Sequence, residues 1–215
     1  YVHDTLMRRV WDEAFTLYGL IAEKIDMPED RSSITFFINS KATFHDGSKI
    51  TRDDVLFSLK TFQEKGTPNQ KKTYGKVINT EFVEKNGIKM TFINNEDKEL
   101  PLIIAGFLPI LSKKFHADLD VTKTFLKIPL GSGPYKIIES MPGKRIVYER
   151  VKNYWARDLP VNKGQYNFDK IIYDYYKDSN VLLEAFKVGD YDYRREYNAK
   201  RWQNNYNFDS SSRKD

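Results

Sequence analysis

The sequence predicts an α+β fold, because helical and strand-like patterns are interspersed along the chain and show no repeat period. Its 215 residues are 40% hydrophobic and 14% aromatic, which supplies enough apolar side chains for a packed core. The mean hydropathy is -0.63, and no apolar run is long enough to cross a bilayer. The composition therefore argues against a disordered chain or an integral membrane protein and for a globular one.

The charge balance and the cysteine count restrict the chemistry of the chain. Lys and Arg number 35 against 30 Asp and Glu, and the two signs alternate, so the net charge of +5 favours acidic partners without identifying one. The absence of cysteine excludes disulfides, thiol catalysis and Cys-ligated metals. The three histidines, His3, His45 and His116, lack metal-ligand spacing, so we predict no metal site and no cofactor.

Four local patterns place elements in the first half of the chain. Apolar residues at mixed three and four spacings predict a broken helix, or a helix and a turn, over 6–24, and alternation predicts a half-buried strand at 34–39. An N-cap followed by an acid predicts a helix over 51–65 that ends at Gly66. Alternating runs on both sides of an Asn-Gly pair predict a hairpin of 77–83 and 88–93.

The second half begins with a short apolar helix at 100–105 and continues, after Pro129, with strands and one helix. The pattern predicts a hairpin of 135–139 and 145–151, a strand at 168–176, a helix at 179–188 and an extended segment at 190–197. Residues 201–215 are polar and rich in Ser and Asn, so we expect a frayed tail that is disordered after Phe208.

Two short motifs resemble catalytic or phosphate-binding sequences, but each has a simpler structural interpretation. His45-Asp46-Gly47 could form an acid/base pair, yet no nucleophile or orienting group accompanies it, and Asp-Gly is typical of a turn. Gly131-Ser132-Gly133 lacks the third glycine and the Lys-Ser/Thr pair of a phosphate-binding loop, and Pro134 follows it. We therefore expect two turns and no catalytic residues.

A basic and aromatic stretch at 191–202 has two functional interpretations. Nucleic-acid stacking is disfavoured because acidic residues interrupt the positive field, so we predict no nucleic-acid partner. In an extended backbone one face would carry Tyr191, Tyr193, Arg195 and Tyr197. Such a face suits recognition of a peptide backbone or a carboxylate, and an ordinary half-buried strand with an Arg that reaches solvent is the alternative.

Four motifs in order along the chain resemble one protein family. They are the segments 44–55 (FHDGSKITRDDV), 131–135 (GSGPY), 153–155 (NYW) and 185–192 (AFKVGDYD). Together they resemble the family 5 extracellular solute-binding proteins, the peptide-, dipeptide- and nickel-binding receptors of bacterial ABC importers. Residues 173–178 and 198–202 are most similar to the YejA branch, which is associated with oligopeptide and microcin C uptake.

The resemblance implies a non-enzymatic, periplasmic receptor with a two-lobed fold of the type II periplasmic-binding-protein kind. Such a receptor encloses an oligopeptide and delivers it to the permease subunits of an ABC importer. It also implies that 1–127 form the smaller subdomain of the N-terminal lobe and 128–200 part of its main sheet, followed by the tail at 201–215. By the resemblance, we expect the chain to be a middle section of the first lobe, without the second lobe.

Two functional hypotheses follow from the residues and the resemblance. In the first, a remaining half-cleft binds oligopeptide weakly or not at all, because the contacts of the other lobe are missing. Its predicted lining is Tyr193, Arg195 and Tyr197, with Asn69 and Tyr74 from the loop after the first helix. In the second, the chain is a free-standing interaction module that binds a protein partner through an exposed sheet edge. The same unpaired edge could produce a homo-oligomer.

Overall fold

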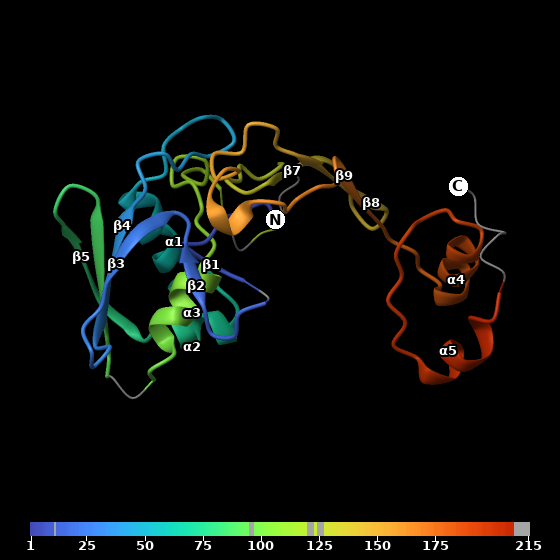
Figure 1. Cartoon of the computed structure of the whole chain (residues 1–215), viewed down its shortest axis with the longest axis horizontal. Helices are drawn as coiled ribbons and strands as arrows, with labels where there is room; N and C mark the ends of the chain where they lie inside the picture. The colour runs from blue at the N-terminus through green and yellow to red at the C-terminus, as the bar shows by residue number, and fades with distance from the viewer. Residues whose placement is uncertain (11, 95–96, 120–122, 124–126, 209–215) are drawn as a thin grey trace. The chain divides into compact units, whose positions relative to one another are not determined.

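The computed structural model describes residues 1–10, 12–94, 97–119, 123 and 127–208, and it divides into two compact units (Figure 1). Unit 1 comprises Tyr1–Ser140 and Val147–Ile171, and unit 2 comprises Met141–Ile146 and the chain from Ile172 onward. Helices and strands are interspersed in the order of the chain, which confirms the predicted α+β class. Whether the subdomain boundary of the family lies at 127 stays a prediction.

A four-stranded antiparallel sheet forms the centre of unit 1, in the order β3-β4-β6-β5. Its strands are β3 (Ala22–Asp26), β4 (Ser33–Ile38), β5 (Val77–Val83) and β6 (Gly87–Phe92). The predicted strand and hairpin are thus confirmed. All six residues of β4 are buried, not every second one, because β4 lies in the interior of the sheet with both faces covered.

Helix α1 (Arg52–Lys65) begins and ends where the sequence predicts. At its start, the backbone N–H of Thr51 donates to Oδ2 of Asp54 over 2.9 Å, as in a capping box. At its end Gly66 has a φ of -68°, so a left-handed backbone conformation does not explain the glycine. A Cβ at Gly66 would lie 2.4 Å from the carbonyl oxygen of Phe62, so this close approach requires glycine.

Two further helices follow in unit 1. The apolar helix α3 (Leu100–Phe107) confirms the prediction for this region. Helix α2 (Pro68–Tyr74) lies where we predicted a loop. The signals of a helix start are nevertheless present in the sequence, because Thr67 is the N-cap, Pro68 is the first helical residue and Gln70 closes a capping box.

The N-terminal segment forms strands, so the predicted helix over 6–24 is wrong. Strand β1 (Met7–Arg9) pairs antiparallel with β2 (Leu17–Gly19), and β3 follows directly. The backbone N–H groups of Leu20 and Ala22 both donate to the carbonyl oxygen of Leu6. Three consecutive residues, Leu20, Ile21 and Ala22, are buried, which no single helix face allows. Pairing with remote segments therefore overrides the local periodicity.

A second sheet contains β7 (Tyr135–Met141), β8 (Arg145–Arg150) and β9 (Lys170–Asp174) in the order β7-β8-β9. This confirms the second predicted hairpin and the strand after it. The turn of the hairpin contains Gly143, whose φ is 70°. Within the described residues β7 and β9 each have one neighbour, so each leaves one edge unpaired. A short 3-10 helix, η1 (Pro160–Asn162), precedes β9.

Unit 2 contains two helices, α4 (Ser179–Lys187) and α5 (Ala199–Asn205). The first is the predicted helix, and Asp178 caps it by accepting from the N–H groups of Asn180 and Val181. Residues 190–197 form irregular backbone without a strand. Helix α5 includes 201–205, which corrects the predicted tail over those residues, and the disorder predicted after Phe208 falls outside the described residues.

Within the described part of the chain, no helix is long and apolar enough to span a membrane. Nor do those residues group three or more His, Asp or Glu side chains in a way that could hold a metal ion.

Candidate functional site

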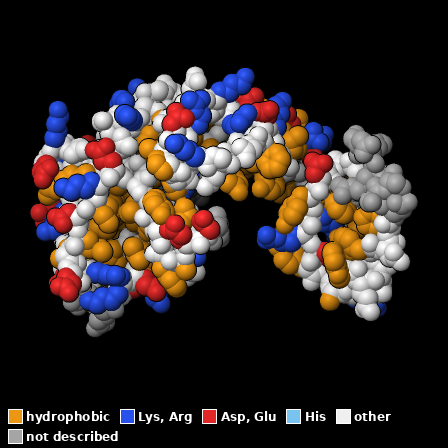
Figure 2. All heavy atoms as spheres, viewed as in Figure 1, with side chains coloured by type: hydrophobic (Ala, Val, Ile, Leu, Met, Phe, Trp, Pro, Cys, Tyr) orange, Lys and Arg blue, Asp and Glu red, His pale blue; other side chains and the backbone are white. Residues whose placement is uncertain are grey.

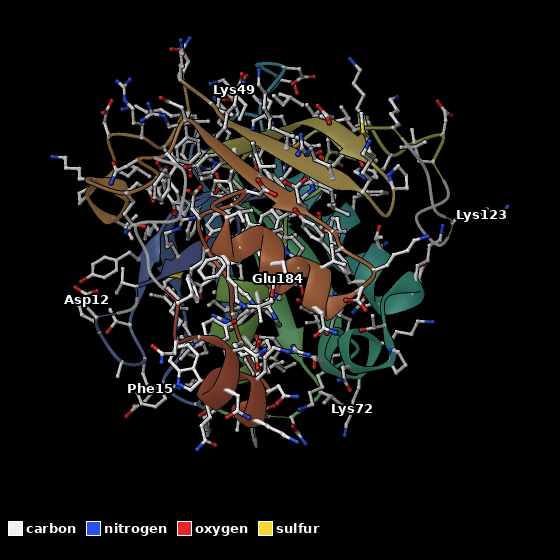
Figure 3. All side chains as sticks on the ribbon, turned by 90° about the vertical axis from the view of Figure 1, so that its right-hand side faces the viewer. Asp12, Phe15, Lys49, Lys72, Lys123 and Glu184 are labelled. Atoms are coloured by element: carbon white, nitrogen blue, oxygen red, sulfur yellow. The ribbon has the colours of Figure 1, made fainter. Side chains whose placement is uncertain are left out.

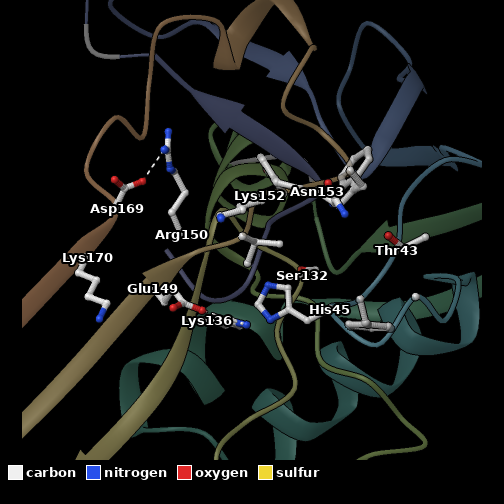
Figure 4. A pocket seen from close by; sticks show the side chains of 15 residues that line it. Thr43, His45, Ser132, Lys136, Glu149, Arg150, Lys152, Asn153, Asp169 and Lys170 are labelled. Atoms are coloured by element: carbon white, nitrogen blue, oxygen red, sulfur yellow. Dashed lines mark hydrogen bonds and ion pairs between the residues drawn. The ribbon is translucent and has the colours of Figure 1, made fainter.

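Unit 1 contains a solvent-open cleft of about 710 Å³ at one end of the β7-β8-β9 sheet (Figure 4). The loop that contains His45, the segment after β8 and the first residues of β7 and β9 form its walls. Tyr154 and Trp155 lie among the lining residues. The charged residues that line it are Lys136, Glu149, Arg150, Lys152, Asp169 and Lys170.

The loop at His45-Asp46-Gly47 is a hydrogen-bonded turn, as the sequence predicts. Oδ1 of Asp46 accepts from the backbone N–H of Ser48 over 3.0 Å and from its hydroxyl over 2.6 Å. Gly47 has a φ of 83°, which favours glycine. Asp46 is therefore engaged within its own turn and does not orient the imidazole of His45.

His45 instead connects this loop to the glycine-containing segment before β7. Its backbone N–H donates to the carbonyl oxygen of Gly131 over 2.8 Å, and Nε2 donates to the carbonyl oxygen of Gly133 over 2.8 Å. Burial lowers the pKa of His45, so the ring is neutral at pH 7. The residue thus has a structural role at the wall of the cleft.

Gly131-Ser132-Gly133 packs directly against the N-terminal segment. The N–H groups of Ser132 and Gly133 donate to the carbonyl oxygen of Val2 over 2.9 and 2.8 Å. A Cβ at Gly131 would lie 2.1 Å from that same oxygen. The amides are used by backbone, which explains the glycines without a phosphate and supports the predicted turn before β7.

Asp4 is buried beside the cleft, and the sequence analysis did not identify it. The hydroxyl of Tyr154 lies 3.0 Å from each carboxylate oxygen, and Nε1 of Trp155 donates over 3.1 Å. The backbone N–H of Asp4 donates to the hydroxyl of Ser132 over 3.0 Å. Burial raises the pKa of Asp4 to about 7, although Arg8, 3.9 Å away, and the two donors lower it. No local pattern links residues this far apart in sequence.

Two ion pairs neutralise part of the charge on the side chains that line the cleft. Nζ of Lys136 lies 3.1 Å from a carboxylate oxygen of Glu149, across β7 and β8. Arg150 pairs with Asp169, as the dashed line in Figure 4 shows. Neither Lys152 nor Lys170 forms an ion pair within the described residues, so both ammonium groups are available to a ligand.

Three of the predicted ligand-binding residues lie together in unit 2. Tyr193 is 74% exposed and Tyr197 is 83% exposed, and Arg195 lies between them in the chain. Nη1 of Arg195 donates to the Tyr197 hydroxyl over 3.2 Å. These residues therefore form one exposed surface, which we call the tyrosine–arginine surface. Tyr191 is not part of it, because its hydroxyl donates to the carbonyl oxygen of Leu182 over 2.7 Å.

The residues that alternate with this surface face the interior of unit 2. The side chains of Arg194 and Glu196 are only 4% and 5% exposed, and their charged atoms lie 2.9 Å apart. Nε of Arg194 donates to the Tyr206 hydroxyl over 2.7 Å. Glu196 also lies 3.4 Å from Arg201 of α5. The alternation of exposed and buried side chains thus holds over 193–197 in irregular backbone but fails at Tyr191 and at the exposed Asp192, and the buried pairs anchor the segment.

The other two predicted residues lie in unit 1, on helix α2 and not on a loop. Asn69 is exposed. Tyr74 is 4% exposed, and its hydroxyl donates to the carbonyl oxygen of Phe107 over 3.1 Å, so in this chain it belongs to the core. Asn69 and Tyr74 thus belong to unit 1, whereas the tyrosine–arginine surface belongs to unit 2. A role for Asn69 and Tyr74 in ligand binding stays a prediction.

Comparison with known proteins gives consistent matches over nearly the whole chain. The profile described as bacterial extracellular solute-binding proteins, family 5 Middle, matches residues 16–213. The uncharacterized protein YejA of Escherichia coli is 40% identical, over 97% of this chain and 34% of that protein. The protein of Agrobacterium fabrum named probable peptide-binding protein YejA is 35% identical, over 96% of this chain and 34% of that protein.

Solved structures show the same fold. The oligopeptide-binding protein AppA of Bacillus subtilis, in complex with a nonapeptide, matches with a TM-score of 0.67 and 21% identity. The match covers 88% of this chain and 37% of AppA. The chain therefore spans about a third of the length of these relatives. The predicted fold, part of a periplasmic-binding-protein type II-like lobe, is confirmed.

Proposed function

Because the chain belongs to the bacterial extracellular solute-binding proteins, family 5, we propose that it is part of a receptor that binds an oligopeptide and delivers it to ABC permease subunits. The profile match over 16–213 is the observation that carries this proposal. A relative named as a peptide-binding protein and a neighbour solved with a nonapeptide support the choice of ligand. The proposed role is non-enzymatic, and the proposed compartment is the periplasm.

The tyrosine–arginine surface is the ligand-binding surface that we propose within this chain. Two exposed phenol rings would pack on the peptide, and the Arg195 guanidinium would pair with an acidic side chain or the terminal carboxylate. The buried pair of Arg194 and Glu196 holds the backbone behind these side chains. The backbone of this segment then loses less conformational freedom when the ligand binds, which favours affinity.

The length of the chain sets the expected affinity. In a two-lobed receptor the ligand is enclosed when the lobes close, and each lobe supplies part of the contacts. This chain corresponds to about a third of its relatives, so it offers only part of that enclosure. We expect weaker peptide binding than in a full-length relative, because polar groups of the ligand stay solvated and little apolar area is buried.

The test is isothermal titration of acidic, neutral and basic tetrapeptides into this chain and into a full-length relative. Arg195→Ala should weaken binding of the acidic peptide about tenfold in this chain, and so should the same change in a full-length relative that has an arginine there, because a charge-assisted hydrogen bond is lost. Arg157→Ala is the matched control, since Arg157 is an exposed arginine whose ion pair within the described residues is with its neighbour Asp158. Equal affinity of the Arg195→Ala protein and the unmodified protein would remove Arg195 from the site.

A second candidate function is favoured by the unpaired edges of β7 and β9. Ile138 and Ile172 on these strands are 39% and 52% exposed, so an added strand would find apolar side chains beside free backbone groups. In this case the chain binds a protein partner by strand addition. Ile172→Pro should then abolish partner capture in a pull-down, with peptide binding absent from the unmodified chain as well.

A further inference from the structure

Two lysines and one glutamate lie side by side at the end of the β7-β8-β9 sheet that borders the cleft, and Lys152 lines the same cleft just after β8. The N–H of Lys144 donates to the carbonyl oxygen of Met141, which closes the hairpin and sets Lys136 opposite Glu149. The N–H of Arg150 donates to the carbonyl oxygen of Asp169, and this pairing places Lys170 of β9 opposite Glu149 of β8. Lys136, Glu149 and Lys170 therefore form one row across the same face of the sheet.

The charge of this cleft is not balanced by its own residues. Four basic and two acidic side chains line it, which leaves an excess of two positive charges. Glu149 is paired with Lys136, and Asp169 is paired with Arg150. The excess is therefore located on Lys152 and Lys170. His45, close enough to Lys136 to sense its charge, adds none at pH 7 because burial lowers its pKa (Figure 4).

On the face of unit 1 that Figure 2 shows, the two signs of charge are interspersed. Lys152 and Lys170 line the same cleft without an ion pair among the described residues, and an anion bound there offsets their positive charge. We propose that this cleft binds a small dianion, which is a phosphate group or a pair of carboxylates. The site is separate from the tyrosine–arginine surface, and it goes beyond the proposed peptide binding.

The volume and the lining residues of the cleft indicate the chemistry of the rest of the ligand. The cleft volume of about 710 Å³ is within the usual range for small-molecule sites. It is much larger than the volume of one phosphate or one dicarboxylate. Phe44, Tyr154 and Trp155 also line the cleft, beside the charged residues. The proposed occupant thus carries two negative charges that Lys152 and Lys170 neutralise, and an organic body that contacts Trp155, since Phe44 and Tyr154 are only 3% and 6% exposed.

Titration calorimetry of the whole chain tests this proposal at pH 7.5 and low ionic strength. The probes are inorganic phosphate and sodium succinate, which distinguish a phosphate group from paired carboxylates. The expected result is saturable one-site binding of at least one probe, weakened about tenfold or more in Lys152→Gln/Lys170→Gln. The charge-retaining variant Lys152→Arg/Lys170→Arg should keep the binding within a few-fold.

A charge-matched control separates a site from general attraction to a basic protein. Lys71 and Lys72 lie on α2, outside the cleft, and Figure 3 shows Lys72 extending away from the chain. Lys71→Gln/Lys72→Gln lowers the net charge by the same amount and should leave probe binding unchanged. The proposal is overturned by the absence of saturable binding of either probe, or by an equal loss in both double variants.

Side-chain NMR gives a second readout that does not depend on the folding of the double variant. The ring resonances of His45 at the cleft wall should shift with probe concentration in the unmodified chain, and those of His116, which is not among the lining residues, should stay constant. A uniform shift of both rings, or none at His45 at saturating probe, contradicts the proposal. Either single variant, Lys152→Gln or Lys170→Gln, serves if the double variant loses its circular dichroism signal.

Discussion

At the scale of single residues, Asp4 shows how a side chain without any sequence signal becomes important. It is 1% exposed, and its carboxylate accepts from Tyr154 and Trp155, about one hundred and fifty positions later in the chain. Burial disfavours the charged form and outweighs Arg8 and both donors. A carboxyl group with a pKa near 7 is therefore built into the wall beside the cleft.

The raised pKa of Asp4 predicts a pH dependence of stability. The folded state binds a proton up to about pH 7, whereas the unfolded chain releases it near 3.8. The resulting stabilisation is complete below pH 3.8 and is lost as the pH rises through 7. Asp4→Asn removes this titration, so its melting temperature should fall less between pH 5 and 8 than that of the unmodified chain. Equal slopes in circular dichroism melts would contradict the assignment.

The glycines before β7 predict a second effect at this scale. A Cβ at Gly131 would lie 2.1 Å from the Val2 carbonyl oxygen, so Gly131→Ala must move backbone. We expect a loss of about 1–3 kcal/mol in the free energy of unfolding, measured by urea denaturation. Gly106→Ala on α3 is the control, because its nearest atom is a side-chain methyl of Leu17 at 3.3 Å. A similar loss in both variants would show that close packing at Gly131 is not the cause.

At the scale of elements, helix starts and tight turns were predictable because their signals are local. The N-cap of α1, the first residue of α4 and both hairpins lie where the sequence places them. Strand β4 was also predicted, but its complete burial was not predicted, since burial depends on which elements cover each face of the sheet. The three N-terminal strands were missed because a mixed apolar spacing does not reveal which distant segment each residue meets.

The capping box of α1 predicts unequal effects at two adjacent acids. Asp54 accepts from the Thr51 N–H over 2.9 Å and, through its other oxygen, from the Lys113 N–H over 2.9 Å. Asp54→Ala should lower the free energy of unfolding by about 1–3 kcal/mol. Asp53→Ala should cost less than about 1 kcal/mol, because Asp53 is exposed and forms a 3.6 Å ion pair. Equal losses in urea denaturation would contradict this account of the cap.

At the scale of the whole molecule, the chain is about a third of the length of its relatives. Its surface includes apolar side chains that a longer chain or a partner could cover. Phe15, which is 87% exposed, is one such residue, and Figure 3 shows it at the periphery. Together with the unpaired edges of β7 and β9 in the described sheet, this surface predicts self-association.

Light scattering after gel filtration measures that association. We expect the mass to rise above that of one chain as the concentration increases, and Ile172→Lys on the edge strand β9 should reduce the rise. Val181→Lys is the control, because it replaces a 58% exposed valine on helix α4 and not on an edge strand, and it should leave the rise unchanged. A single-chain mass at every concentration would remove the predicted homo-oligomer.

The sequence by itself determined the α+β class, most helix and hairpin positions and the family, because these depend on capping residues, turn residues and short motifs that are contiguous in the chain. It also placed Tyr193, Arg195 and Tyr197 on one face. Only the tertiary structure decided that Tyr74 fills the core, that Asp4 meets Tyr154, and that Lys136, Lys152 and Lys170 share a cleft. Those outcomes depend on contacts between segments far apart in sequence, whose burial and charge no local pattern encodes.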